Sequence, residues 1–458
     1  MRKVVPLLTI VAASLVVLLG LLALRQSGWG SASREASNVA AGGEASRVII
    51  VSPHSLAIEK EFKRAFEAWH LARFGNRCEV EWQDHGGTSD AVRFIKSEFV
   101  ASPNGIGVDI FWGGGMEPYL QFDELGLLQP IRLPEATLSA LPPSVAGVPL
   151  YNAAHTWYGT AISGFGIIWN RKRIAGLAQP EPKTWADLAE QGFFGEVAAA
   201  DPRASGTALA ILEVILQAYG WEKGFGILTR LSGNVKTFAI GAGDIPKLVS
   251  MGEAATGLAI DFYAWIQIRQ DGKDKIGFVL PEGLTAFTPD GFGILKGAPH
   301  AKSAQRFAQF VMSPEGQALW VLPKGFPGGP VEYELLRIPV LPGVYKEYAA
   351  VTNVMFDPSA ARASFHYDPA KAAARRDALK DLYGAIFVDL STDLAAAWRA
   401  VIRRGLKPAE VKALCAPPMS EEELTNLSMT QWSNANTRNR ILTEWTNLAL
   451  ERYKSLAR

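Results

Sequence analysis

The sequence predicts an α/β protein with two lobes, two crossover strands and an extra helical segment at the C-terminus. Short β-branched apolar runs alternate with amphipathic helical patterns from residue 47 onward, and strands that alternate with helices form a largely parallel sheet. The long strand-like segment Trp157–Asn170 interrupts this alternation and is interpreted as a crossover into a second lobe. An apolar content of 48% over 458 residues is enough for a large core.

The first lobe begins with three strands that are separated by helices. Residues 47–51 form the first strand, and the helix that follows it ends at Gly75. Residues 78–83 alternate as a second strand, residues 89–101 form a helix, and residues 108–112 form a third strand. Ligands collect beyond the carboxyl ends of such strands, so we expect the small polar loops there to line a binding site.

The second lobe repeats the alternation with its own strands and helix starts. In order, we expect a strand at 196–200, a helix from Ala208, a strand at 235–240, a loop and helix start at 241–246 and a strand at 255–261. Residues 277–281 are expected to cross back, and later helices to include 301–312 and 438–456. The predicted boundaries are 47–158 for the first part of lobe 1, 159–282 for lobe 2, and 283–458 for the return to lobe 1 with C-terminal helices.

The N-terminus carries a segment that directs export. Arg2 and Lys3 precede the uncharged residues 4–24, a stretch longer than the roughly 7–15 residues of a signal-peptide core and close to the roughly 20 that span a bilayer. A signal-anchor is therefore favoured over a cleaved signal peptide, which remains the alternative. Residues 26–46 are rich in Ser, Ala and Gly and are interpreted as a flexible tether. Either alternative places the rest of the chain in the periplasm or on the extracytoplasmic face.

Charge and cysteine content exclude several classes of protein. The 46 basic and 45 acidic residues create no field for a polyanion, so we expect no nucleic-acid partner. Cys78 and Cys415 fit neither a metal nor a nucleophile pattern, and the sequence leaves open whether they pair. No zinc-protease, nucleophile-elbow or P-loop motif occurs in the sequence, so we assign no catalytic residue, metal or cofactor.

One loop has the composition of an anion site. Residues 201–207 lie between a strand and a helix, where unpaired backbone N–H groups and the positive end of the helix dipole meet. Ser205 and Thr207 add hydroxyl donors, and Gly206 permits close approach to the backbone. An ordinary helix cap is the alternative. Arg203 either adds a charge-assisted bond or points into solvent.

Further candidates follow other strands. After the first strand come Ser52, His54 and Ser55, and after the third come Gly113, Gly114 and Gly115, whose backbone N–H groups can reach a ligand. A lone histidine is as often structural as functional. Gly243 lies in a second helix-start loop of the far lobe.

Five motifs in register carry a family resemblance. They are Thr184-Trp185-x-Asp187-Leu188, Asp201-Pro202-x-x-Ser205-Gly206-Thr207, Gly252-Glu253-Ala254-Ala255-x-Gly257, Lys296-Gly297-Ala298-Pro299-His300 and Met312-Ser313-Pro314-Glu315-Gly316-Gln317. In this order the sequence resembles bacterial extracellular solute-binding proteins of ABC importers, in the subgroup of iron, phosphonate and sugar-phosphate binders with the type II periplasmic fold. The resemblance spans about residues 47–330.

The resemblance implies two lobes that close over a ligand in the cleft, and delivery to a membrane permease with a cytoplasmic ATPase. It implies no catalysis, since the protein captures its ligand by preferring the closed state. We expect a monomer that binds a small anion such as a phosphonate or an organic or sugar phosphate. The N-terminal anchor would keep the protein near its permease.

Ferric iron is the alternative ligand. Ferric binders of this family carry two adjacent tyrosines near the position of Asp261-Phe262-Tyr263, whereas Phe262 here supplies no oxygen ligand. His54, Asp261 and Tyr263 are the remaining ferric candidates, and Asp261 and Tyr263 are also candidate contacts for another ligand. Tyr263 could equally be a packing residue. Two other classes of function stay open, namely an exported hydrolase and a sensory ectodomain.

Overall fold

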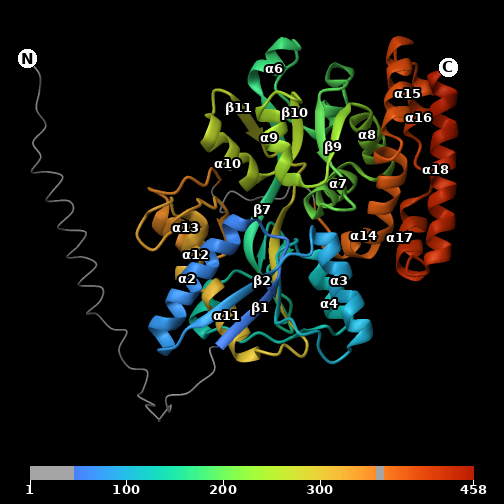
Figure 1. The fold of residues 1–458 in the computed structure, drawn as a ribbon. Helices are drawn as coiled ribbons and strands as arrows, with labels where there is room; N and C mark the ends of the chain where they lie inside the picture. The colour runs from blue at the N-terminus through green and yellow to red at the C-terminus, as the bar shows by residue number, and fades with distance from the viewer. Residues whose placement is uncertain (1–45, 357–365) are drawn as a thin grey trace, which may run out of the picture. The chain divides into compact units, whose positions relative to one another are not determined.

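Strand β7 (Trp157–Asn170) joins the two lobes. The computed structural model describes residues 46–356 and 366–458, and β7 is buried along its whole length. Its first half, up to Gly164, pairs antiparallel with β12 (Phe287–Leu295), and its second half, from Phe165, pairs antiparallel with β10 (Thr256–Ile260). Figure 1 shows β7 passing from the lower to the upper lobe. The segment predicted to cross between the lobes does so.

Lobe 1 is built on the strand order β2-β1-β3-β12. Strand β1 (Ser46–Val51) pairs in parallel with β2 (Cys78–Gln83) and with β3 (Ile110–Trp112), as the alternating pattern predicted. Helices α2 (Leu56–Phe74) and α3 (Thr88–Ala101) connect these strands. Both faces of β1 from Val48 onward and of β3 are buried, which explains why these are continuous apolar runs, whereas the edge strand β2 alternates between buried and more exposed residues.

Lobe 2 is a second sheet on the far half of β7. It contains β8 (Val197–Ala200), β9 (Val235–Ala239), β10 and β11 (Ile276–Val279), and its helices are α7 (Gly206–Tyr219), α8 (Trp221–Gly233), α9 (Ile245–Ser250) and α10 (Asp261–Asp271). Two expectations need correction. Strand β11 pairs with β7 inside lobe 2 and does not cross back, because β12 is the return strand. Asp261 does not end a strand, since it begins α10.

Shorter elements complete the lobes. They are α4 (Glu117–Glu124), β4 (Leu128–Gln129), α5 (Glu135–Ala140), β5 (Ser144–Val145), β6 (Val148–Pro149), α6 (Arg171–Gly176), α11 (Ala301–Val311), α12 (Pro314–Val321), β13 (Ile338–Pro339) and α13 (Pro342–Tyr348). Helices α11 and α12 pack on α2, and β13 pairs with β7, so the chain returns to lobe 1 after β12.

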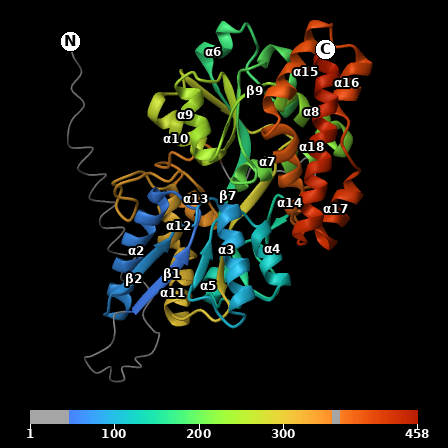
Figure 2. The same cartoon turned by 45° about the vertical axis from the view of Figure 1, so that its right-hand side comes forward.

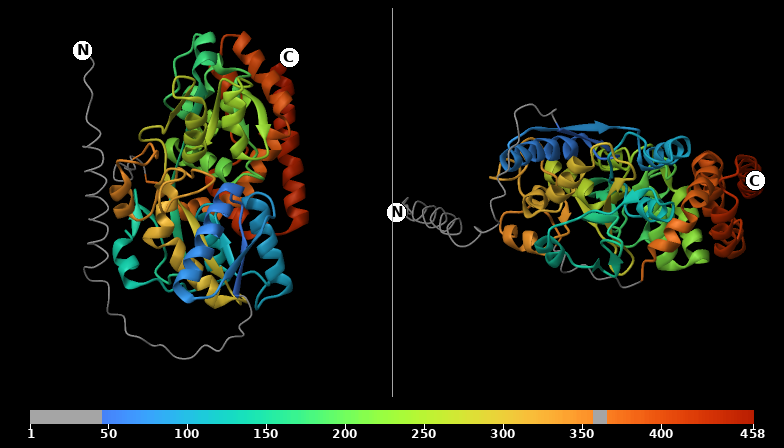
Figure 3. Two further views of the ribbon diagram at one scale, coloured as in Figure 1. Left: turned by 60° about the vertical axis from the view of Figure 1, so that its left-hand side comes forward. Right: turned by 90° about the horizontal axis from the view of Figure 1, so that it is seen from below.

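Five α-helices follow in the described residues, and we refer to them as the C-terminal module. They are α14 (Pro369–Tyr383), α15 (Ser391–Arg403), α16 (Pro408–Cys415), α17 (Glu421–Thr430) and α18 (Ala435–Ala457). Helices α15 and α16 pack on α8 of lobe 2, whereas α14 contacts both α7 of lobe 2 and α4 of lobe 1. Figures 2 and 3 show this module along one side of both lobes, not within lobe 1 as the expected boundary 283–458 implied.

The predicted N-terminal anchor, residues 4–24, lies outside the described residues, as does the tether apart from Ser46. Among the helices that the structure describes, none is both long and apolar enough to cross a membrane. Cys78 and Cys415 are free thiols, which answers the open question of their pairing. Burial raises the pKa of Cys415 to about 11, so this thiol is unreactive near neutral pH.

Candidate functional site

A small cavity of about 90 Å³ lies between the lobes, where loops from both meet. Lobe 1 contributes Pro53, His54, Thr88 and Gly114–Gly115 to its wall, and lobe 2 contributes Gly206 and Thr207. The cavity also touches Ser163 on β7 and Asp290 on β12. Among these, the loops after β1 and β3 and the start of α7 were predicted from the sequence to converge, and they do, whereas Thr88, Ser163 and Asp290 were not predicted.

The loop after β1 contributes one of its three candidates. His54 lines the cavity, and its Nε2 lies 2.7 Å from Asp290 Oδ2. Ser52 is buried, and its hydroxyl accepts a hydrogen bond from the His54 backbone N–H at 3.0 Å, so it shapes the loop. Ser55 precedes α2 without a side-chain capping bond and is absent from the cavity wall.

The glycines after β3 lie beside this histidine. Gly113, Gly114 and Gly115 all have positive φ angles, which disfavour residues with a Cβ atom. A Cβ on Gly113 would lie 2.9 Å from His54 Nε2, so Gly113 supports the imidazole without lining the cavity. Gly115 N–H donates to Asp290 Oδ1 at 3.2 Å.

On the opposite wall, the predicted anion loop divides into a cap and a contact surface. Ser205 is the N-cap of α7 and accepts a bond from Ala208 N–H at 3.2 Å, which is the alternative that the sequence left open. Gly206 and Thr207 line the cavity. Arg203 pairs with Asp201 and Asp389 and is absent from the cavity wall.

The two lobes touch at the start of two helices. A Cβ on Gly87, the N-cap of α3, would lie 2.1 Å from Ala204 O. A Cβ on Gly206 would lie 2.8 Å from Thr88 Oγ1. Only glycine permits the two backbones to approach this closely. The N-termini of α3 and α7 therefore meet across the cleft, and the cleft is closed.

Sequence reasoning missed three buried charged residues of the site, namely Arg337, Asp290 and Glu117. Arg337 is 2% exposed, donates from Nη1 to Asp290 Oδ2 at 2.5 Å and from Nη2 to Ser163 Oγ at 3.0 Å, and lies over the Phe262 ring. Burial disfavours a charged Asp290, but Arg337 and His54 outweigh it and hold the pKa of Asp290 well below its usual range. Only the charged residue within the apolar run Leu335–Ile338 could have drawn attention to Arg337.

Of the remaining candidates, Tyr263 lines the cavity, whereas Gly243 and Asp261 do not. Burial raises the pKa of Tyr263, which keeps its hydroxyl neutral. Both carboxylate oxygens of Asp261 accept backbone bonds, from Gly164 N–H at 2.8 Å and Phe262 N–H at 2.7 Å. Burial nonetheless raises the pKa of Asp261 to about 7. Asp261 therefore connects the N-terminus of α10 to β7.

The ferric set is not assembled in this structure. Within 46–356 and 366–458, no group of three histidine, cysteine or acidic residues is placed to hold a metal ion. His54 is bonded to Asp290, and Asp261 is bonded to backbone N–H groups. Tyr263 alone of the three faces the cavity without such a commitment.

A larger cavity of about 520 Å³ lies elsewhere, between α8 and the α15–α16 connection. Its wall is largely apolar and includes Trp398, Leu406 and Cys415. It holds none of the strand-end loops, and the interlobe cavity is the better site because polar groups from both lobes converge there.

The architecture defines the class. Two α/β lobes that share β7 and close over a polar cavity form the type II periplasmic-binding-protein fold. The fold matches AfuA of Actinobacillus pleuropneumoniae with bound fructose-6-phosphate (TM-score 0.63, 21% identity, 75% of this chain and 99% of that one). It also matches the periplasmic binding protein P5PA (TM-score 0.61, 24% identity, 74% and 98%) and iron-bound HitA of Pseudomonas aeruginosa (TM-score 0.57, 20% identity, 73% and 98%).

Residues 114–338 match the family model of bacterial extracellular solute-binding proteins, in agreement with the resemblance drawn from the sequence. An uncharacterized protein of Haemophilus influenzae is 31% identical over 49% of this chain and 64% of its own length. The phosphoglycerate transport regulatory protein PgtC of Salmonella typhimurium is 29% identical over 36% of this chain and 40% of its own length. The chain thus spans less than two thirds of either relative.

Proposed function

We propose that this protein is the extracytoplasmic solute-binding component of an ABC importer and captures a small anion, such as a phosphonate or an organic or sugar phosphate. The observation that carries the proposal is the meeting of two helix N-termini, from α3 and α7, at one cavity that a buried guanidinium also lines. Each N-terminus offers unpaired N–H groups and about half a positive charge to an anion.

Hydroxyl donors surround these termini. Thr88 and Thr207 belong to the first turns of α3 and α7, and Ser163, Tyr263 and Thr288 also line the cavity. The names of a phosphoglycerate transport protein among the relatives and of a fructose-6-phosphate complex among the similar folds agree with a phosphorylated ligand. The solute would bind without being transformed, as a binding protein and not an enzyme.

The cavity accommodates a small polar group in the closed state. A volume of about 90 Å³ exceeds the roughly 10–15 Å³ that one water needs. Two nitrogen atoms of cavity-lining side chains, His54 Nδ1 and Arg337 Nε, have no hydrogen-bond partner among the described residues. Buried polar atoms without partners are costly, and a ligand or water that reached them would remove this cost.

The proposal extends to partners and location. A monomer would deliver the solute to a membrane permease that is driven by a cytoplasmic ATPase. Residues 4–24 would hold the protein at the extracytoplasmic face near that permease. Neighbouring genes for a permease and an ATPase would support import, whereas an adjacent histidine kinase gene would favour sensing.

A thermal-shift screen followed by calorimetry tests the ligand class. We expect inorganic phosphate, methylphosphonate or glycerol 3-phosphate to stabilise the protein, by about 2.7 kcal/mol at 100 times Kd. The double variant Thr88→Ala with Thr207→Ala should bind that ligand about tenfold or more weakly, because two hydroxyl bonds to a charged group are lost. Thr446→Ala on α18 is the matched control. Stabilisation by ferric citrate alone would contradict the anion assignment.

A further inference from the structure

We propose that Glu117 selects the ligand, and that Tyr367 of the segment leading into the C-terminal module positions it for that role. The inferred ligand carries a hydrogen-bond donor, such as a hydroxyl, beside its anionic group. The inference rests on the proposed function, since it concerns the same cavity. It gives the C-terminal module a part in recognition that the lobes alone would not predict.

Glu117 lies where its carboxylate can contact a ligand. It begins α4, is 6% exposed and lines the cavity. Its Oε1 accepts a bond from the Tyr367 hydroxyl at 2.9 Å. Its Oε2 lies beside Gly115, 3.0 Å from where a Cβ on that glycine would be, and Gly115 is also in the cavity wall. Oε1 is thus bonded to Tyr367, and Oε2 lies at the cavity wall.

Tyr367 reaches Glu117 from the segment that leads into the C-terminal module. The next residue, Asp368, exchanges two bonds with Gln217 of α7, at 2.7 and 3.0 Å. Arg375 of α14 forms two 2.7 Å bonds with Glu213 of the same helix, and both side chains are almost fully buried. The C-terminal module is therefore fixed to lobe 2, and the Tyr367–Glu117 bond joins the lobes.

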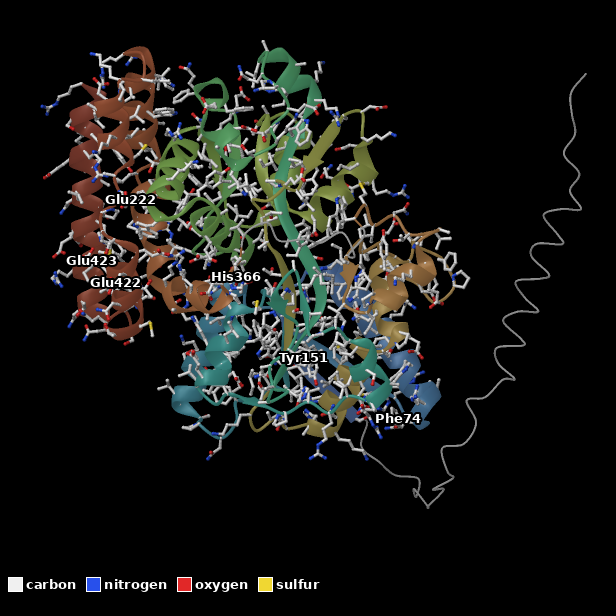
Figure 4. The ribbon with its side chains drawn as sticks, turned by 180° about the vertical axis from the view of Figure 1, so that it is seen from behind. Phe74, Tyr151, Glu222, His366, Glu422 and Glu423 are labelled. Atoms are coloured by element: carbon white, nitrogen blue, oxygen red, sulfur yellow. The ribbon has the colours of Figure 1, made fainter. Side chains whose placement is uncertain are left out.

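The views of the whole chain agree with this placement. Figure 4 labels His366, the residue before Tyr367, at the junction of the C-terminal module with lobe 1. A second bond crosses the same junction, from Gln121 Nε2 of α4 to Ala373 O of α14 at 3.1 Å. Both bonds join α4 of lobe 1 to the C-terminal module or to the segment that leads into it.

The charges of the cavity explain the selection. Asp290 is neutralised by Arg337 and His54, whereas Glu117 has no ion-pair partner in the part of the chain that the structure describes. The Tyr367 hydroxyl donates to one oxygen of this carboxylate and fixes its orientation. The anionic group of a ligand in the same small cavity is repelled by the Glu117 carboxylate unless a hydrogen-bond donor of the ligand lies between them.

Two phosphate esters of similar size separate the attraction of Glu117 for a hydroxyl donor from its repulsion of an anionic group. Glycerol 3-phosphate carries hydroxyl donors and propyl phosphate carries none. We expect the wild-type protein to bind glycerol 3-phosphate about tenfold or more tightly in calorimetry, as a bond to a charged acceptor implies. In Glu117→Gln this preference should fall severalfold, and propyl phosphate should bind more tightly because the repulsion is gone.

The positioning role of Tyr367 has a separate readout. Tyr367→Phe keeps the carboxylate but loses the bond that orients it, so the preference should fall while propyl phosphate binding does not improve. Tyr453→Phe is the control, because Tyr453 is a buried tyrosine of the same module whose hydroxyl donates to Ile386 O, away from the cavity. Tyr453→Phe should leave the preference unchanged.

The outcomes divide as follows. Equal wild-type affinities for the two esters, or parallel losses for both esters in Glu117→Gln, would overturn the inference and leave the proposed function standing. A fall in preference in Tyr453→Phe equal to that in Tyr367→Phe would overturn the positioning role. Failure of inorganic phosphate, methylphosphonate and both esters to bind would overturn the anion assignment of the proposed function and the inference with it.

Discussion

Replacing Asp290 with asparagine should be among the most destabilising single changes in this protein. Asp290 is 7% exposed and accepts three bonds, from His54 at 2.7 Å, Arg337 at 2.5 Å and Gly115 N–H at 3.2 Å. Asparagine keeps the shape but removes the charge, which leaves the buried guanidinium of Arg337 without an anion. Breaking a buried ion pair from one side costs about 3–5 kcal/mol.

Adding the contributions of the individual hydrogen bonds gives a destabilisation of similar size. Two charge-assisted bonds, from His54 and Arg337, contribute about 1.5–3 kcal/mol each, or about 3–6 kcal/mol together. Urea unfolding of the wild-type protein, Asp290→Asn, Arg337→Met and the double variant measures the coupling between the two positions. We expect the double variant to lose less than the sum of the single losses, because neither buried charge is then left alone.

The pH dependence provides a second check. The folded-state pKa of Asp290 is depressed, so its ion pairs stabilise the protein above the unfolded pKa of about 3.9, and this stabilisation is lost as the pH falls through the lower folded value. Acid should therefore destabilise the wild-type protein more than Asp290→Asn. A cost below about 1 kcal/mol for Asp290→Asn at pH 7, or the same acid response in both proteins, would refute the buried pairing, since solvated pairs contribute that little.

Two further changes test lobe closure and the C-terminal module. Gly87→Ala places a Cβ 2.1 Å from a carbonyl of the opposite lobe, which should destabilise only the closed state, by about 1–3 kcal/mol of overpacking. Ligand binding should then weaken about 5- to 150-fold, and X-ray scattering should show a more open protein. Gly343→Ala, where a Cβ meets nothing within 4 Å, is the control, and equal affinities for the two variants would contradict closure at this contact. Glu213→Gln removes the buried partner of Arg375, so limited proteolysis should release the C-terminal module sooner, whereas unchanged cleavage would mean that this pair does not hold the module.

Local patterns in the sequence predicted the parts of the site that depend on chain neighbours. The β1–α2–β2–α3–β3 alternation follows from period-two and helical apolar spacing, and the loops at these strand ends reach the cavity as expected. The Ser205–Thr207 turn was recognised because capping and anion binding both use unpaired N–H groups within one helical turn. The same local logic could not decide that Ser205 caps the helix while Thr207 faces the cavity.

The sequence by itself determined the fold class, the strand-end loops and a helix start suited to an anion, because hydrophobic period and cap chemistry act between near neighbours. Tertiary structure alone decided which charges meet. Asp290 and Arg337 come together from separate elements, and Glu117 meets Tyr367 over a separation of 250 residues. No local signal identifies such pairs, because the apolar run around Arg337 shows at most that this charge is unusual and not which residue it meets. Only the packing of two lobes and a C-terminal module excludes water from them, and that exclusion makes their interactions strong enough to shape the site.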